Sequence, residues 1–195
     1  MELIRGADIF LSSYRPGSLA AQGFSTAELT ALNPNLIIAS LNAWGEEGPW
    51  AMNRGFDSLV QAASGINVAE AESLGGGEAS RVLPCQALDH GSGYLLATGI
   101  MAALYKRAMY GGTYEVHVAL AGVMKYLRSL GQTTKRKAFD QNTFPDPVSL
   151  EKYMEIRDSD FGELKAITHA ASVDGLKVGY KTMSKPLGSD EPVWL

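Results

Sequence analysis

The run Leu36-Ile-Ile-Ala-Ser-Leu41 constrains the fold of this chain more than any other segment. Its side chains are almost continuously apolar and do not alternate, which is typical of a parallel strand that is covered on both faces. Two features precede it: the short apolar run Ala7–Ser12, and the capping-box spacing of Ser25–Glu28, which starts a helix that Asn33-Pro34 ends. The sequence therefore predicts strand, helix and strand, the order of an α/β protein with a parallel sheet.

The segments up to residue 130 extend this pattern. The carboxyl end of a parallel strand is where open sheets bind ligands, so the loop after the central strand holds site candidates. These candidates are Trp44, Trp50, Arg54 and Asp57. Apolar spacing and breaker residues then predict a helix over 57–64, a loop over 69–80, a helix over 91–109, a strand over 113–120 and a helix over 121–130. We expect a partial Rossmann-like open parallel sheet with flanking helices.

The character of the chain changes after residue 130. Residues 131–148 are polar, lack an apolar face and contain Lys135-Arg136-Lys137, which indicates a linker. We expect a helix over 149–157 and a strand-like piece over 166–169 in the remainder. The predicted organisation is thus a main domain over 1–130, a linker over 131–148 and a short irregular C-terminal extension over 149–195.

Composition excludes several classes of function. A net charge of −4 gives no electrostatic basis for binding nucleic acid. The longest apolar run, 94–105, is too short to span a bilayer, so no membrane partner is expected. One cysteine, Cys85, fits a reducing compartment, and the scattered histidines form no metal motif. Nothing resembling a secretory signal starts the chain, so a cytoplasmic location is the expectation, and organellar import is left open.

Asp89 lies in the segment Pro84-Cys-Gln-Ala-Leu-Asp-His-Gly-Ser-Gly93, immediately before a long apolar stretch. A carboxylate at the start of a helix either accepts hydrogen bonds from the first amides or serves as a nucleophile. The position of Asp89 just before the apolar stretch favours the capping role, and the role of nucleophile stays open.

Five separated blocks carry a resemblance to a known family. They are Ala7–Gly17, Leu32–Ser40, Gly45-x-x-Gly48-Pro49, Arg54–Gly65 and the Asp89 segment. In order and spacing they resemble the family III CoA-transferases of the CaiB/BaiF type, the group that includes formyl-CoA transferase, carnitine-CoA transferase and α-methylacyl-CoA racemase. The resemblance covers about residues 5 to 130, and the family's proteins are longer, so the chain looks like a truncated member.

The resemblance implies an acyl-CoA:carboxylate CoA-transferase in which Asp89 forms an aspartyl-CoA thioester. Acyl-CoA and a carboxylic acid acceptor are then the substrates, no covalently bound cofactor is implied, and the family's interlocked dimers imply a homodimer. Developing oxyanions need donors, for which Gln61 and the amides of 91–93 are the candidates. The residues implied to bind CoA are Ser13, Tyr14, Arg15 and Arg54.

Two departures from the family pattern set the alternatives. The histidine that a racemase would need falls at Phe56, which cannot accept a proton, so a racemase is disfavoured. A basic residue after the Arg-Pro-Gly block is replaced by Ala21, and parts of the family's sequence have no counterpart. The second hypothesis is therefore an inactive truncated paralogue that only binds a ligand or partner.

Overall fold

The computed structural model describes residues 1–73, 75–79, 82–132 and 150–194. The chain divides into two compact units, Met1–Thr134 and Lys135–Leu195, which are described separately. Among the described residues no helix combines the length and apolar character needed to cross a membrane.

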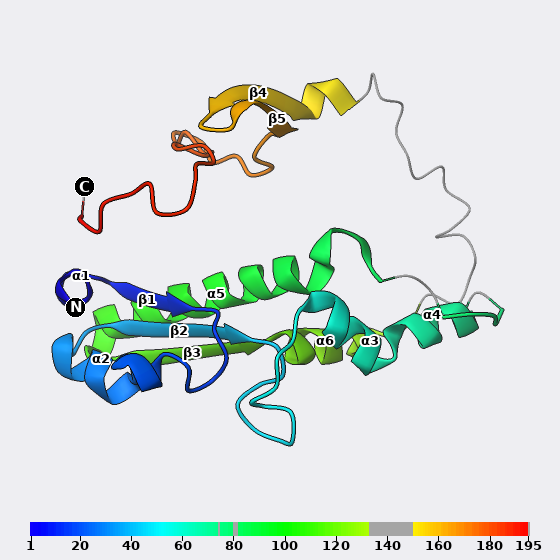
Figure 1. Ribbon diagram of the computed structural model, residues 1–195, viewed down its shortest axis with the longest axis horizontal. Coiled ribbons are helices and arrows are strands. Elements are labelled where there is room, and N and C mark those ends of the chain that lie inside the picture. The colour runs from blue at the N-terminus through cyan, green and yellow to red at the C-terminus, as the bar shows by residue number, and fades with distance from the viewer. Residues whose placement is uncertain (74, 80–81, 133–149, 195) are drawn as a thin grey trace. The chain divides into compact units, whose positions relative to one another are not determined.

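The first unit is built on a parallel sheet in the order β1-β2-β3, with β1 at Ile9–Ser12, β2 at Ile37–Asn42 and β3 at Tyr114–Ala119. The expected central strand is confirmed, since β2 pairs on both sides and its Ile37 and Ala39 are fully buried. The strands point the same way, and helices lie along both faces and beyond the carboxyl ends (Figure 1). The α/β fold class expected from the sequence is confirmed.

The helices of this unit are, in chain order, α1 (Glu2–Arg5), α2 (Thr26–Leu32), α3 (Asp57–Ser64), α4 (Ile66–Ser73), α5 (Ala87–Tyr110) and α6 (Leu120–Ser129). Short 3-10 turns occur at Ala20–Gln22 and Pro84–Gln86. The capping box before α2 forms as predicted, because the Ser25 hydroxyl accepts from the Glu28 amide and the Glu28 carboxylate accepts from the Ser25 amide. The loop expected over 69–80 is wrong for its first residues, which continue α4.

Two apolar clusters hold the layers together. Between the sheet and α2, Ile4, Leu29, Leu36 and Ile38 form one buried group. Around α3, α5 and α6 a second group consists of Val60, Leu88, Leu120, Val123 and Met124. The second cluster lies where the first turn of α5 meets the helices beyond the sheet, so it fixes the position of that turn.

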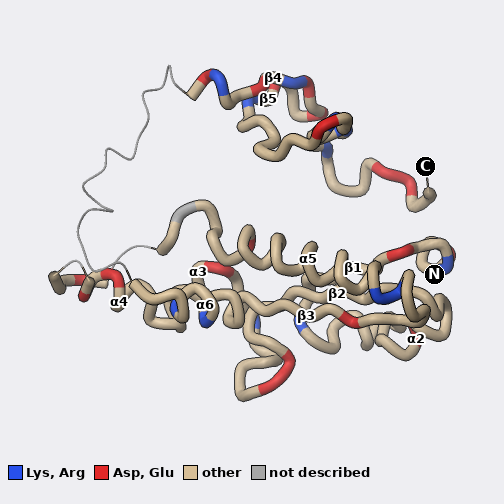
Figure 2. Tube along the Cα trace, turned by 180° about the vertical axis from the view of Figure 1, so that it is seen from behind, with Lys and Arg blue, Asp and Glu red and all other residues tan. Residues whose placement is uncertain are grey.

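Helix α5 packs closely on β3. A Cβ atom added at Gly99 would lie 2.5 Å from Val116 Cγ1, which explains why no side chain stands there. On the outward side α5 exposes Tyr94, Met101 and Tyr105. The middle of the helix carries almost no charge (Figure 2). One face of α5 is therefore covered by the sheet, while the other presents a largely uncharged, aromatic-rich surface.

The second unit contains a two-stranded antiparallel sheet of β4 (Met154–Ser159) and β5 (Gly162–Ile167), preceded by a 3-10 turn at Glu151–Tyr153. The helix expected over 149–157 is wrong for its second half: residues 151–153 form the 3-10 turn, residues 154–157 belong to β4, and residue 149 lies outside the described residues. β5 overlaps the strand-like piece expected at 166–169. The predicted linker lies mostly outside the described residues, and the proposed domain boundaries stay a prediction.

Candidate functional site

Asp89 is the third residue of α5, and its side chain is exposed at the end of the helix that lies toward the carboxyl ends of the strands (Figure 1). Helix α5 begins earlier than the predicted 91. The residues just before it, Cys85 and Gln86, have the positive φ angles 63° and 50°, a left-handed backbone that turns the chain into the helix. Asp89 therefore sits in the first helical turn and does not occupy the N-cap position.

A different carboxylate caps α5. Asp57, which is 1% exposed, accepts hydrogen bonds on Oδ2 from the amides of Leu88 at 2.6 Å and Asp89 at 3.2 Å. Asp57 is itself the first residue of α3, so one buried negative charge lies at the amino ends of two helices, where the helix dipoles favour it. The sequence analysis named Asp57 among the candidate site residues of the loop after β2, and in the structure it caps the amino end of α5.

Gln61 completes the same network. It is fully buried, its Nε2 donates to Asp57 Oδ1, and its Oε1 accepts from the Leu83 amide at 2.7 Å. Its amide group thus links α3 to the segment that leads into α5. The geometry makes Gln61 a positioning residue for Asp89, and its expected part as an oxyanion donor stays a prediction.

The amides of residues 91–93 do not form the expected set of oxyanion donors. They lie inside α5, where each amide beyond the first four is bonded to the carbonyl four residues before it. The amides of Leu88 and Asp89 are already occupied by Asp57. Ser92 was not singled out from the sequence; its hydroxyl is fully buried one turn after Asp89 and has no hydrogen-bond partner among the described residues.

The environment raises the pKa of Asp89 above its ordinary value. Partial removal of water by the surrounding protein is the largest cause, and the negative charge of Asp57 adds to it, while His90 opposes the shift. A carboxylate whose charged form is disfavoured is more basic, and a more basic carboxylate is a better nucleophile.

The four residues implied to bind CoA lie on two loops at the carboxyl end of the sheet. Ser13, Tyr14 and Arg15 follow β1 directly and are exposed, and they line a small cavity of about 40 Å³. The other wall includes Asn53 and Gly55, the two neighbours of Arg54 in the chain. Asp89 is not among the residues that line this cavity.

The loop after β2 is held by its own backbone and side chains. Trp44 Nε1 donates to the Arg54 carbonyl at 3.1 Å, and Asn42 Oδ1 accepts from the Gly45 amide at 2.6 Å. A Cβ atom at Gly55 would collide with Ala43, so only glycine allows this close return of the chain. Within the described part of the chain the guanidinium groups of Arg15 and Arg54 have no carboxylate partner, so both are available to an anionic ligand.

A polar row crosses the sheet beside this loop. Ser12 pairs in register with Ser40, and Ser40 with His117, so all three share one face. Ser40 Oγ lies 2.7 Å from His117 Nδ1, and Glu46 lies 3.0 Å from the same nitrogen. The row lines a second cavity of about 150 Å³ together with Tyr14 and Arg15. The sequence analysis missed this row, although alternate side chains of a strand lie on the same face of the sheet, and this alternation could have indicated it.

Trp44 and Trp50, also candidates from the sequence, contact each other edge to face at 4.8 Å between ring centroids. With Val60 and Met124 they line a cavity of about 370 Å³ between α3 and α6. Phe56, at the position where a racemase would need histidine, is 72% exposed immediately before α3. Among the described residues no group of three or more histidine, cysteine, aspartate or glutamate side chains could hold a metal ion.

Comparison with known proteins shows which protein family has this architecture. The model of CoA-transferase family III matches residues 1–146. A probable fatty acyl-CoA transferase of Mycobacterium tuberculosis is 33% identical over 154 residues, which are 78% of this chain and 38% of that protein. The acetyl-CoA:oxalate CoA-transferase of Acetobacter aceti is 34% identical over 129 residues, which are 66% of this chain and 33% of the relative.

Solved structures agree. A crystal structure of the mycobacterial protein superposes with a TM-score of 0.59 at 32% identity, covering 66% of this chain and 36% of that one. A CaiB/BaiF family protein from Brucella suis gives a TM-score of 0.56 at 25% identity, covering 83% and 42%. The chain thus spans well under half the length of the proteins it matches. From the matched region and its shared fold, the chain belongs to CoA-transferase family III.

Proposed function

We propose that this chain carries the nucleophilic part of an acyl-CoA:carboxylate CoA-transferase, with Asp89 as the catalytic residue. The observation that carries the proposal is the position of Asp89: an exposed carboxylate with a raised pKa in the first turn of α5, within the region matched by the family. Relatives named as acetyl-CoA:oxalate and formyl-CoA:oxalate CoA-transferases support acyl-CoA and a carboxylate as the substrate classes.

The proposed reaction uses the carboxylate twice. An Asp89 oxygen attacks the thioester carbonyl, the C–S bond of the adduct breaks, and CoA leaves as a thiolate, which gives a mixed anhydride between Asp89 and the donor acid. The thiolate then attacks the Asp89 carbonyl carbon, which releases the donor acid and leaves an aspartyl-CoA thioester. An acceptor carboxylate attacks the carbonyl of this thioester, the C–S bond breaks, and a second mixed anhydride forms as the CoA thiolate is expelled. The thiolate then attacks the acyl carbon of the acceptor, which gives the new acyl-CoA and frees the Asp89 carboxylate.

The surrounding residues divide the remaining tasks. Asp57 and Gln61 hold the first turn of α5 without touching substrate, because both are buried and engaged with each other and with backbone amides. Ser13, Tyr14, Arg15 and Arg54 are proposed to receive CoA, with the unpaired guanidinium groups directed to phosphate. The cavity beside Trp44 and Trp50, whose lining is mostly apolar but includes Lys125 and Arg128, is a candidate for the acyl group.

Covalent capture tests the proposal. The protein is incubated with acetyl-CoA, and its intact mass is measured before and after treatment with hydroxylamine, which cleaves thioesters. We expect a CoA adduct that hydroxylamine removes and that Asp89→Asn abolishes. Asp174→Asn, the same substitution at an exposed site of the second unit, is the matched control and should retain the adduct. No adduct together with no CoA binding by calorimetry would overturn the transferase proposal in favour of an inactive paralogue.

A further inference from the structure

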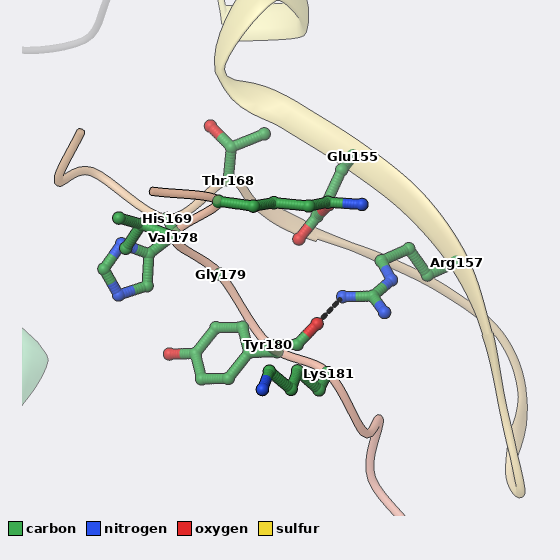
Figure 3. Close-up of a pocket in the computed structure, with 9 residues that line it drawn as sticks. Glu155, Arg157, Thr168, His169, Val178, Gly179, Tyr180 and Lys181 are labelled. Carbon is green, nitrogen blue, oxygen red and sulfur yellow. Dashed lines mark hydrogen bonds between the residues drawn. The ribbon is translucent and has the colours of Figure 1, made fainter. Parts of the chain in front are cut away.

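The second unit contains a hollow of about 610 Å³ that has no part in the site around Asp89. Side chains from β4, from the residues after β5 and from the segment 177–181 line it. Figure 3 shows Arg157, His169 and Tyr180 arranged around it. This volume lies within the range of about 300–1,000 Å³ that is usual for small-molecule sites.

Positive charge in this hollow exceeds negative charge. Its lining includes Arg157, Lys177 and Lys181, against Glu155 as the one carboxylate among the lining residues. Within the described residues none of the three cations has a carboxylate partner. Cations that converge on a concave surface without a counter-charge favour an anionic ligand.

Two other lysines of this unit, unlike Lys177 and Lys181, make ion pairs. Lys165 pairs with Glu151 at 2.7 Å, and Lys185 pairs with Asp190. Carboxylates are therefore available in this unit and neutralise lysines outside the hollow. Of the four described cations of this unit that have no carboxylate partner, three line the hollow, and the fourth, Lys152, lies over the ring of Tyr153.

Arg157 is held in place for such a ligand. Its Nη1 donates to the Tyr180 carbonyl at 2.7 Å, the contact drawn in Figure 3. This bond anchors the guanidinium group and leaves its other N–H donors free for a planar or tetrahedral anion. A cation fixed before binding loses less side-chain entropy when the ligand arrives.

The hollow also has an aromatic wall. The rings of His169 and Tyr180 meet edge to face, 5.8 Å between centroids, and Tyr180 is 63% exposed. An exposed ring offers a flat surface on which a heteroaromatic base can stack. Cations for phosphate and a ring for a base together match the two ends of a nucleotide.

We propose that the hollow of the second unit is a nucleotide-binding site. The phosphates contact Arg157, Lys177 and Lys181, and the base lies against Tyr180. A free nucleotide and the nucleotide end of CoA share this chemistry, and the experiment separates them.

Isothermal titration of the full chain with ADP, CoA, pyrophosphate and adenosine, all without magnesium, tests the site. We expect ADP to bind at least tenfold more tightly than adenosine, and pyrophosphate to compete with it. The variant Lys177→Ala/Lys181→Ala should weaken ADP binding at least tenfold. Lys165→Ala, which removes one charge outside the hollow, is the matched control and should change the dissociation constant less than twofold.

Other variants make the outcome decisive. Glu155→Gln should tighten ADP binding severalfold, because it removes the opposing charge. Weakening of both ADP and CoA in the double lysine variant assigns a general nucleotide site, and weakening of CoA alone assigns its nucleotide end. Unchanged binding of both in the double lysine variant, or an equal loss of ADP binding in Lys165→Ala, overturns the proposal. Because the adduct on Asp89 has a separate readout, either proposal can fail without the other.

Discussion

Replacing Asp57 by asparagine puts an NH₂ group into a place where each hydrogen-bonding neighbour is already a donor. Asp57 accepts from the amides of Leu88 and Asp89 on one oxygen and from Gln61 Nε2 on the other. With the asparagine oxygen turned toward α5, its NH₂ group faces the NH₂ group of Gln61. Turning the Gln61 amide only moves the conflict to the Leu83 amide, which needs the Gln61 oxygen. One donor–donor contact remains in every arrangement.

This conflict sets the expected loss of stability. A buried donor left without an acceptor costs roughly 1–3 kcal/mol, and the lost negative charge at the amino end of α5 adds about 0.3–1 kcal/mol. With a urea dependence of about 1–3 kcal/mol per molar, the unfolding midpoint should fall by roughly 1 M.

A compensating change gives the prediction its sharpest test. In Asp57→Asn/Gln61→Glu the asparagine NH₂ donates to the new carboxylate, whose second oxygen accepts from the Leu83 amide. Gln61→Glu alone sets two buried carboxylates against each other and should be destabilising. The double variant should therefore be more stable than either single variant, as measured by urea unfolding followed by far-ultraviolet circular dichroism. Additive losses in the double variant, or an unchanged midpoint for Asp57→Asn, would refute the network as described.

Three further predictions rest on separate features. Gly99→Ala should destabilise the first unit by roughly 1–3 kcal/mol through its contact with Val116, and Val116→Ala in the same chain should recover part of the loss, as followed by urea unfolding. Ser25→Ala removes the capping box of α2 and should cost about 1 kcal/mol, visible as a lower Tm, whereas Ser18→Ala should cost less. Asp89→Asn should raise Tm at neutral pH, because a pKa that is higher in the folded than in the unfolded state means that folding disfavours the charged carboxylate; this gain should shrink as the pH falls toward 3.8, the ordinary value, and a gain that grows on acidification would contradict the raised pKa.

The elements that could be predicted are those whose signals are local. The Ser25–Glu28 spacing specifies its own cap, and the apolar run of β2 specifies burial on both faces wherever it lies. In the segment 149–157, however, the apolar spacing suits a helix, and the residues from Met154 onward become a strand because they pair with β5 across a turn of two residues, a pairing that apolar spacing within the segment does not show. The helical start of the span 69–80 was missed because its glycines indicate a loop.

The same division applies to the site. Asp89 could be singled out because its position before an apolar stretch and the family blocks both mark it. Asp57 could not be identified as the cap of α5, because it lies 31 residues earlier and nothing local links it to Asp89 or Leu88. Only the tertiary packing of α3 against α5 brings the buried carboxylate to those amides.

The backbone turn before α5 has a practical consequence. Cys85, in that turn, is exposed and is the single cysteine of the chain. A thiol-reactive fluorophore would therefore attach at one known position, four residues before Asp89, without any engineered substitution. The native protein thus has its own attachment point for a spectroscopic reporter. The signal of this reporter can follow in real time the binding of a ligand at the amino-terminal end of α5.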